Sequence, residues 1–204
     1  SSFDLRQSIV SKYKTPNKDI VIIAIDDATY EYIMDKYGSW PISRKIWANI
    51  INSLENANPK FIVFDMLFLK SNLQDKISDS LFIESIKNNE NIFLSMNFDN
   101  YSDEIRKSPI IPEKFQLNIK NGKLNDNQYV NYTNARMIME ELSKETKNLG
   151  AISIIRDSDG IIREATPIFK YKNNYYPNLS LAVGIKALNK DFINITNNNI
   201  VIDE

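Results

Sequence analysis

The chain of 204 residues contains no cysteine and no histidine. These absences exclude a disulfide framework, a thiol nucleophile, a Ser-His-Asp triad and the usual zinc ligand sets. Lys and Arg number 25 and Asp and Glu number 26, so the net charge is -1 and the basic excess of nucleic-acid-binding proteins is missing. Any chemistry must therefore use carboxylates, Lys, Arg, Tyr or Ser. No cofactor and no metal is expected.

Long apolar runs are also missing. No stretch approaches the roughly 18 apolar residues that suggest a transmembrane helix, and no signal-peptide pattern is present. The chain begins with Ser rather than Met, which leads us to expect a fragment of a larger protein. Hydrophobic residues make up 43% and charged residues 25%, an ordinary globular composition. We expect residues 1–204 to form a single domain.

In the first half of the chain, apolar residues alternate between strand-like runs and helical spacing. Residues 20–25 and 60–64 are short continuous runs rich in β-branched residues, which predict strands buried on both faces. An apolar stripe over 43–57 predicts a helix between them, so the segment indicates a right-handed βαβ unit. Further helices are expected at 3–13, 30–37 and 79–88, with a third strand at 91–95.

The second half is less regular. Polar residues and prolines over 98–134 favour loops with a short hairpin, and a helical pattern returns at 135–147. Strands are expected at 149–155 and 161–171, joined by a tight turn, followed by a helix at 178–188 and an edge strand at 200–202. The predicted fold is mixed α/β. Its central mixed sheet has an N-terminal parallel βαβ part, a C-terminal antiparallel hairpin, and helices on both faces.

Three blocks resemble the type-two CHASE domain, an extracytoplasmic sensory module of bacterial receptors. The first is Phe3-Asp4-Leu5-Arg6. The second comprises an apolar strand ending at Asp26, the segment from Gly38 through Trp40 and Pro41 to Arg44, and a strand ending at Asp65. The third is Leu149-Gly150 followed by Asp157-Ser158-Asp159-Gly160 and Arg163. Residues 98–148 match no family pattern and are expected to be a variable region.

The resemblance implies a receptor with membrane helices on both sides of this domain. Residues 3–13 would be a membrane-proximal helix, and the domain would lie on the extracytoplasmic side of the bacterial cell membrane. A cytoplasmic output domain would follow, commonly an adenylate or other nucleotide cyclase, otherwise a histidine kinase, diguanylate cyclase, phosphodiesterase or Ser/Thr kinase. The receptor would work as a homodimer, its signal would be a small molecule or a protein, and no nucleic acid would bind. Asp79 falls where the family often has an acidic residue opening a helix.

Asp26 and Asp65 end two predicted neighbouring strands, and ligands bind beyond the carboxyl ends of such strands. Arg44, in the first turn of the intervening helix, needs a carboxylate partner because its charge opposes the helix dipole. We therefore predict a polar cluster of Asp26, Arg44 and Asp65, with Trp40 beside it. The cluster could bind a ligand or serve only as a salt bridge with helix caps. Trp40 could be packed or could stack on a ligand.

Asp157, Asp159 and Gly160 match the beginning of a calcium-binding loop, but no Glu follows at its twelfth position. A tight turn in which Arg163 pairs with an Asp is the better interpretation. Our leading hypothesis is a sensory module without catalysis. The alternatives are a Mg²⁺-dependent enzyme that uses Asp26 and Asp65, and a purely structural dimerisation module. A phospho-receiver domain is disfavoured because the segment between the two Asp residues lacks the required βα unit.

Overall fold

The computed structural model describes residues 2–15, 17–101, 109–125, 129–157, 159–196 and 199–202. Contacts within the chain divide it into two compact units, Ser1–Ile42 and Ser43–Glu204. Each unit is described by itself. Among the described residues, no helix is long and apolar enough to cross a membrane. The assignment of 1–204 to one sensor domain stays a prediction.

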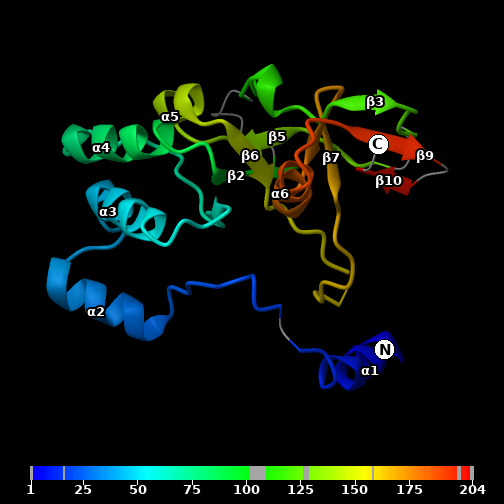
Figure 1. The fold of residues 1–204 in the computed structure, drawn as a ribbon, viewed down its shortest axis with the longest axis horizontal. Coiled ribbons are helices and arrows are strands. Elements are labelled where there is room, and N and C mark those ends of the chain that lie inside the picture. The colour runs from blue at the N-terminus through cyan, green and yellow to red at the C-terminus, as the bar shows by residue number, and fades with distance from the viewer. Residues whose placement is uncertain are drawn as a thin grey trace. The chain divides into compact units, whose positions relative to one another are not determined.

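The first unit contains two helices, α1 (Ser2–Ser11) and α2 (Asp27–Tyr37) (Figure 1). Both were predicted from their apolar spacing. The Asp26 carboxylate accepts a hydrogen bond of 2.8 Å from the Thr29 N–H and so caps α2. Asp26 is thus the N-cap of α2. Gly38 ends the helix in the left-handed conformation, with φ 70°.

The predicted strand at 20–25 is wrong. These residues form no regular secondary structure and connect α1 to α2 as an irregular segment (Figure 1). Val21 and Ile22 are 82% and 85% exposed, and no hydrogen bond joins the backbone of 21–25 to a described residue. The apolar β-branched run favours an extended chain, but a strand also needs a neighbour, and the sequence pattern does not supply one.

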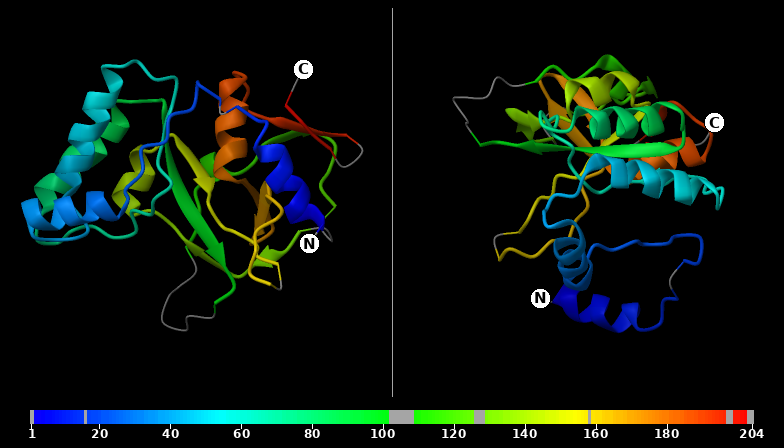
Figure 2. Two further views of the ribbon diagram at one scale, coloured as in Figure 1. Left: turned by 90° about the horizontal axis from the view of Figure 1, so that it is seen from below. Right: turned by 90° about the vertical axis from the view of Figure 1, so that its left-hand side faces the viewer.

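The second unit is organised around β2 (Ile92–Asp99). This strand pairs in parallel with β1 (Ile62–Val63) and β6 (Asn148–Ala151), and antiparallel with β5 (Asn134–Arg136). Helix α4 (Lys76–Lys87) connects β1 to β2, so the chain contains a parallel βαβ unit. The predicted unit of 20–25, 43–57 and 60–64 is wrong, because 20–25 form no strand. Helix α3 (Arg44–Glu55) lies beside α4 (Figures 1 and 2).

Two smaller sheets complete the second unit. One has the order β4 (Asn131–Tyr132), β7 (Ile168–Tyr171) and β8 (Asn174–Pro177), and the other β10 (Asn199–Val201), β9 (Ile193–Thr196) and β3 (Ile119–Asn121). The remaining helices are η1 (Glu113–Phe115), α5 (Glu140–Glu145) and α6 (Leu179–Ala187). The mixed α/β fold with parallel and antiparallel strands is confirmed.

The C-terminal antiparallel hairpin is present, but its strands differ from those predicted. We expected 149–155 to pair with 161–171, whereas β6 pairs with β2, and β7 pairs with β8 across a turn at Lys172 and Asn173. Those two turn residues have φ 47° and 66°, the left-handed conformation of a tight hairpin. Asp159 and Gly160 lie in a turn, and no strand flanks it in the described part of the chain.

Two aromatic clusters make up much of the core. Trp47 on α3 packs edge-on against Phe64 and Phe68, which also contact Phe82 of α4. The second cluster surrounds Phe98 at the end of β2 and comprises Tyr132, Phe169, Tyr171 and Tyr176. The first cluster anchors α3 and α4 to the central sheet and so fixes the loop that follows β1.

Candidate functional site

A buried ion pair joins the beginnings of α3 and α4. Arg44 Nη1 lies 2.6 Å from Asp79 Oδ1, and the two side chains are 15% and 8% exposed. The other oxygen of Asp79 accepts the N–H of Asn72 at 2.6 Å, and Arg44 Nη2 donates to the Lys70 carbonyl at 2.6 Å. The pair therefore holds the backbone of residues 70–72 from both sides.

Ser43 and the N-terminal cap of α4 reinforce this junction. The Asp75 carboxylate accepts the N–H of Ser78 at 3.1 Å and its hydroxyl at 2.5 Å, and these bonds lower the pKa of Asp75. The Ser43 hydroxyl donates to Ser78 Oγ at 2.8 Å and to Asp75 at 3.2 Å. Ser43 therefore occupies the N-cap position of α3, but its hydroxyl hydrogen-bonds to side chains at the beginning of α4 instead of capping α3.

The structure gives Arg44 a carboxylate partner, as predicted, but the partner is Asp79 rather than Asp65. Asp65 is exposed just after β1 and has no side-chain partner among the described residues. Asp79, in the first turn of α4, faces Arg44 and is favourably placed for the helix dipole. The prediction of an Arg44–Asp65 contact is wrong because β1 ends after two residues and Asp65 faces water.

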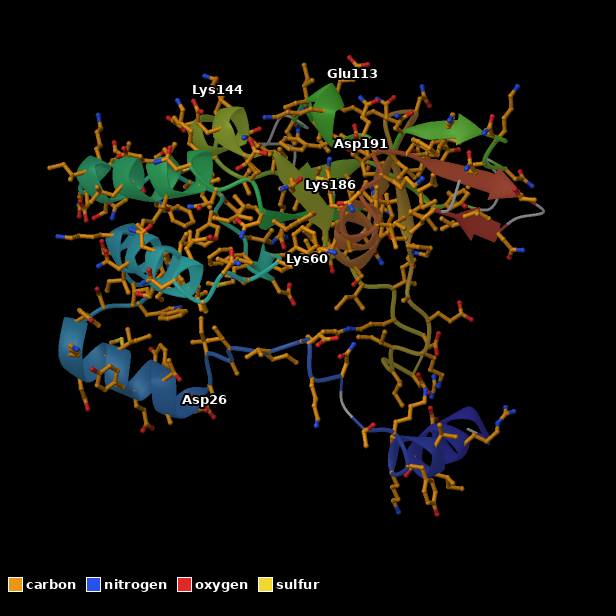
Figure 3. All side chains as sticks on the ribbon, in the orientation of Figure 1. Asp26, Lys60, Glu113, Lys144, Lys186 and Asp191 are labelled. Atoms are coloured by element: carbon orange, nitrogen blue, oxygen red, sulfur yellow. The ribbon has the colours of Figure 1, made fainter. Side chains whose placement is uncertain are left out.

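The other residues of the predicted cluster lie in the first unit. Asp26 is at the beginning of α2 (Figure 3), where its bonds to Thr29 lower the pKa of the Asp26 carboxyl. The Trp40 ring packs edge-on against Tyr30, with 5.8 Å between ring centres, and stays 40% exposed. A ligand-binding role for Asp26, Trp40, Arg44 and Asp65 stays a prediction.

The turn near Gly160 matches the structural interpretation. Arg163 lies 2.6 Å from Asp157 and 2.7 Å from Asp159, and the bond from Arg163 lowers the pKa of Asp159 to about 2. The Gly160 N–H donates to the Asp157 carbonyl at 2.8 Å, with φ 80° at Gly160. Ser158 lies outside the described residues. The predicted pairing of Arg163 with an Asp of this turn is confirmed.

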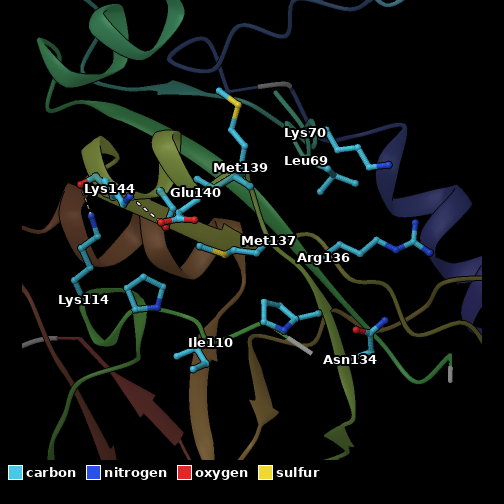
Figure 4. A pocket seen from close by; sticks show the side chains of 15 residues that line it. Leu69, Lys70, Ile110, Lys114, Asn134, Arg136, Met137, Met139, Glu140 and Lys144 are labelled. Atoms are coloured by element: carbon cyan, nitrogen blue, oxygen red, sulfur yellow. Dashed lines mark hydrogen bonds and ion pairs between the residues drawn. The ribbon is translucent and has the colours of Figure 1, made fainter. Parts of the chain in front are cut away.

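A pocket of about 1030 Å³ opens in the second unit, next to the segment that Arg44 holds (Figure 4). Three parts of the chain line it. They are Leu69 and Lys70 after β1, the stretch of Pro109, Ile110, Pro112 and Lys114, and the chain from β5 into α5, residues 134–140, 143 and 144. Its size and its mixture of apolar and charged side chains are typical of small-molecule sites.

Hydrogen bonds fix two walls of the pocket. The Met139 N–H donates to the Phe68 carbonyl at 2.8 Å, and the Ser71 hydroxyl donates to Glu141 at 3.3 Å. These bonds tie the segment after β1 to the beginning of α5. Because Arg44 also donates to Lys70, the buried Arg44–Asp79 pair stands directly behind one wall of the pocket.

Cations gather on the lining. The Lys114 ammonium donates to the carbonyls of Lys144 and Thr146 at 3.1 and 2.7 Å, and burial lowers the pKa of Lys114. Lys144 pairs with Glu140 at 2.7 Å. Arg136 Nε lies 3.1 Å from Asp99, behind the lining. The described residues include no group of three or more acidic side chains placed to hold a metal ion.

A family model described as the CHASE2 domain matches residues 1–203. This chain belongs to the CHASE2 family. CHASE2 domains are extracytoplasmic sensory domains of membrane-bound signalling receptors. Neither the curated proteins nor the solved structures include a match to the chain.

Sequence reasoning missed the pocket of this CHASE2 domain. Most of its lining comes from 98–148, where the sequence predicted only loops, a short hairpin and a helix, and where the family resemblance supplied no pattern. The sequence pointed to the pocket only indirectly. Arg44 belongs to a block that resembles the family, and it donates a hydrogen bond to Lys70, which lines the pocket. Chemically, the pocket combines apolar surface with hydrogen-bond donors, an arrangement that suits binding.

Proposed function

We propose that this CHASE2 domain binds a signal molecule in the pocket beside Lys70 and passes the signal to a cytoplasmic nucleotide cyclase. One observation supports the proposal most. The pocket wall at Leu69 and Lys70 is hydrogen-bonded to the buried Arg44–Asp79 pair, which joins the first turns of α3 and α4. A ligand that moves this wall therefore acts on two helices of the core.

The domain itself carries out no catalysis in this proposal, since CHASE2 is a sensory family. Its output depends on the parent receptor, which spans the membrane and works as a homodimer. Closed two-fold pairs are the commonest assembly of soluble domains, and they suit outputs that form between two copies. Helix α1 connects the domain to the preceding membrane helix.

The proposal is tested by filling the pocket in the membrane receptor that carries this chain. Ile110 lines the pocket and is 88% exposed, so Ile110→Trp adds an indole without disturbing the core. We expect this variant to change cyclic-nucleotide formation severalfold at equal receptor abundance. Leu73→Trp is the control, because Leu73 is 81% exposed in the same unit and does not line the pocket.

Two results would contradict the proposal. If the Ile110→Trp and Leu73→Trp receptors both match the wild type, the pocket does not control the output. If neither the wild-type receptor nor any variant forms a cyclic nucleotide, the assignment of a cyclase output is wrong.

A further inference from the structure

The charged side chains that line the pocket are mostly of one sign. Four are cations, from Lys70, Lys114, Arg136 and Lys144, and one is an anion, from Glu140. The whole chain has a net charge of -1, so this excess is local. Glu140 is engaged by Lys144, and Asp99 engages Arg136 from behind the lining. Two of the positive charges have no ion-pair partner among the described residues, although the Glu145 carboxylate, which pairs with Lys87, also acts on the Lys114 charge.

Those two charges belong to Lys70 and Lys114. Among the described residues, neither ammonium has a carboxylate within ion-pair distance. Lys114 donates to two carbonyl oxygens, which hold the group in place without neutralising its charge. An ammonium has three N–H donors, and two carbonyls engage Lys114, whose nitrogen also lies 4.8 Å from the centre of the Phe115 ring. An anion in the pocket would supply the missing negative charge.

The rest of the lining is largely apolar. In the view of Figure 4, Lys114, Lys144 and Glu140 lie toward one end and Lys70 and Arg136 toward the other, with Met137 and Ile110 between them. A ligand that contacts a cation at one end therefore lies along apolar side chains. Cations lie at both ends, so a ligand with a negative charge at one end of its molecule can contact either end and keep its apolar part along the middle of the pocket.

We propose that the pocket binds an organic anion with an aliphatic body, of the monocarboxylate class. The carboxylate accepts charge-assisted hydrogen bonds from Lys70 or Lys114, and the body packs on Ile110 and Met137. This inference names the ligand class of the site in the proposed function and rests on that proposal. A carboxylate is a group that a lysine ammonium recognises, and the aliphatic part supplies apolar burial.

Isothermal titration of the purified 204-residue chain with octanoate, 1-octanol and inorganic phosphate tests the inference. Octanoate carries both a negative charge and an aliphatic body, 1-octanol carries only the aliphatic body, and phosphate carries only the negative charge. We expect octanoate to bind at least about tenfold more tightly than either of the others, since a charge-assisted hydrogen bond contributes more than a factor of ten. Raising the salt concentration should weaken octanoate binding by screening the charges.

Two variants and a control test which lysine binds the carboxylate of octanoate. Lys70→Gln and Lys114→Gln each keep a polar side chain but remove the positive charge, so the variant at the end that holds the carboxylate should weaken octanoate binding about tenfold and leave 1-octanol binding unchanged. Octanoate binding that is unchanged in both variants would overturn the inference. Lys70 has no side-chain hydrogen bond among the described residues, so its replacement should not disturb folding. Lys123→Gln removes one exposed charge outside the pocket and should leave octanoate binding unchanged.

Several results would overturn the inference. Equal binding of 1-octanol and octanoate would mean that the pocket does not select an anion. Equal binding of phosphate would remove the aliphatic body from the ligand class, and absence of any octanoate heat would reject the ligand class altogether. Each of these leaves the proposed function to be judged separately by the Ile110→Trp receptor, because that experiment reads output without using an added ligand.

Discussion

Arg44 and Asp79 form their ion pair where both side chains are largely withdrawn from water. Removing one partner would leave the other charge buried and uncompensated, which is costlier than losing an exposed pair. Arg44→Ala should therefore lower the free energy of unfolding by about 3–5 kcal/mol. Adding Asp79→Asn to that variant should recover part of the loss, because the stranded carboxylate is then neutral.

Urea denaturation of the 204-residue chain measures both effects. Asp65→Asn is the matched control, since Asp65 is exposed, and its change should stay within about 0.5 kcal/mol. A midpoint for Arg44→Ala equal to that of the wild type would show that the pair is solvated. Recovery by Asp65→Asn instead of Asp79→Asn would show that the partner is misassigned.

The sequence predicted that Arg44 needs a carboxylate partner, but not that the partner is Asp79. A cation in the first turn of a helix indicated that Arg44 requires a carboxylate. Choosing between Asp65 and Asp79 depends on where β1 ends and how α4 is turned, and both are set by tertiary packing. The partner of Arg163 was easier to predict, because Asp159 is only four residues away in the sequence.

Among the elements, β6 and α6 approach each other at Gly150. A Cβ added to Gly150 would lie 2.4 Å from Leu179 Cα and 2.8 Å from its nitrogen, both backbone atoms that cannot move aside alone. Gly150→Ala should therefore destabilise the chain by about 1–3 kcal/mol, the range for overpacking. Thermal unfolding of the variant checks the prediction.

Gly184 within α6 provides the control, since a Cβ there meets no heavy atom nearer than 4.0 Å. Gly184→Ala should stabilise the chain by about 0.5–1 kcal/mol, because alanine is the better helix former. A Gly150→Ala variant that melts at or above the wild-type temperature would mean that β6 and α6 are not in close contact.

Helices were predicted better than strands because helical signals are local. The helices predicted at 30–37, 79–88 and 178–188 correspond to α2, α4 and α6, each within a few residues of its bounds. The sheet depends on partners far apart in the chain. The pairing of β2 with β6 and of β7 with β8 could not be read from alternation alone, and the short strands β3 to β5 left no clear pattern.

For the whole molecule, the exposed run at 20–25 bears on assembly. All six residues carry apolar side chains, and the backbone groups of 21–25 have no hydrogen-bond partner among the described residues, as an antiparallel pairing of two copies requires. One such strand, about 20 Å long, buries less than a standard interface, so the dimer should be weak.

We predict that Ile22→Lys shifts the isolated chain toward monomer in sedimentation equilibrium, whereas Leu188→Lys, at an exposed apolar position in the second unit, does not. Unchanged self-association of Ile22→Lys would remove this segment from the interface.

In the proposed function, the pocket faces the outside of the cell and receives the signal there. The chain has no cysteine, so Ile110→Cys places one reactive thiol at the pocket in the parent receptor, with Leu73→Cys as an exposed control and the wild-type receptor as background. The decisive measurement is the labelling rate of this thiol by a membrane-impermeant maleimide in intact cells. We predict that both variants are labelled without permeabilisation, and that octanoate slows labelling of Ile110→Cys only. Labelling that requires permeabilisation, or octanoate that leaves both rates unchanged, would contradict the claim.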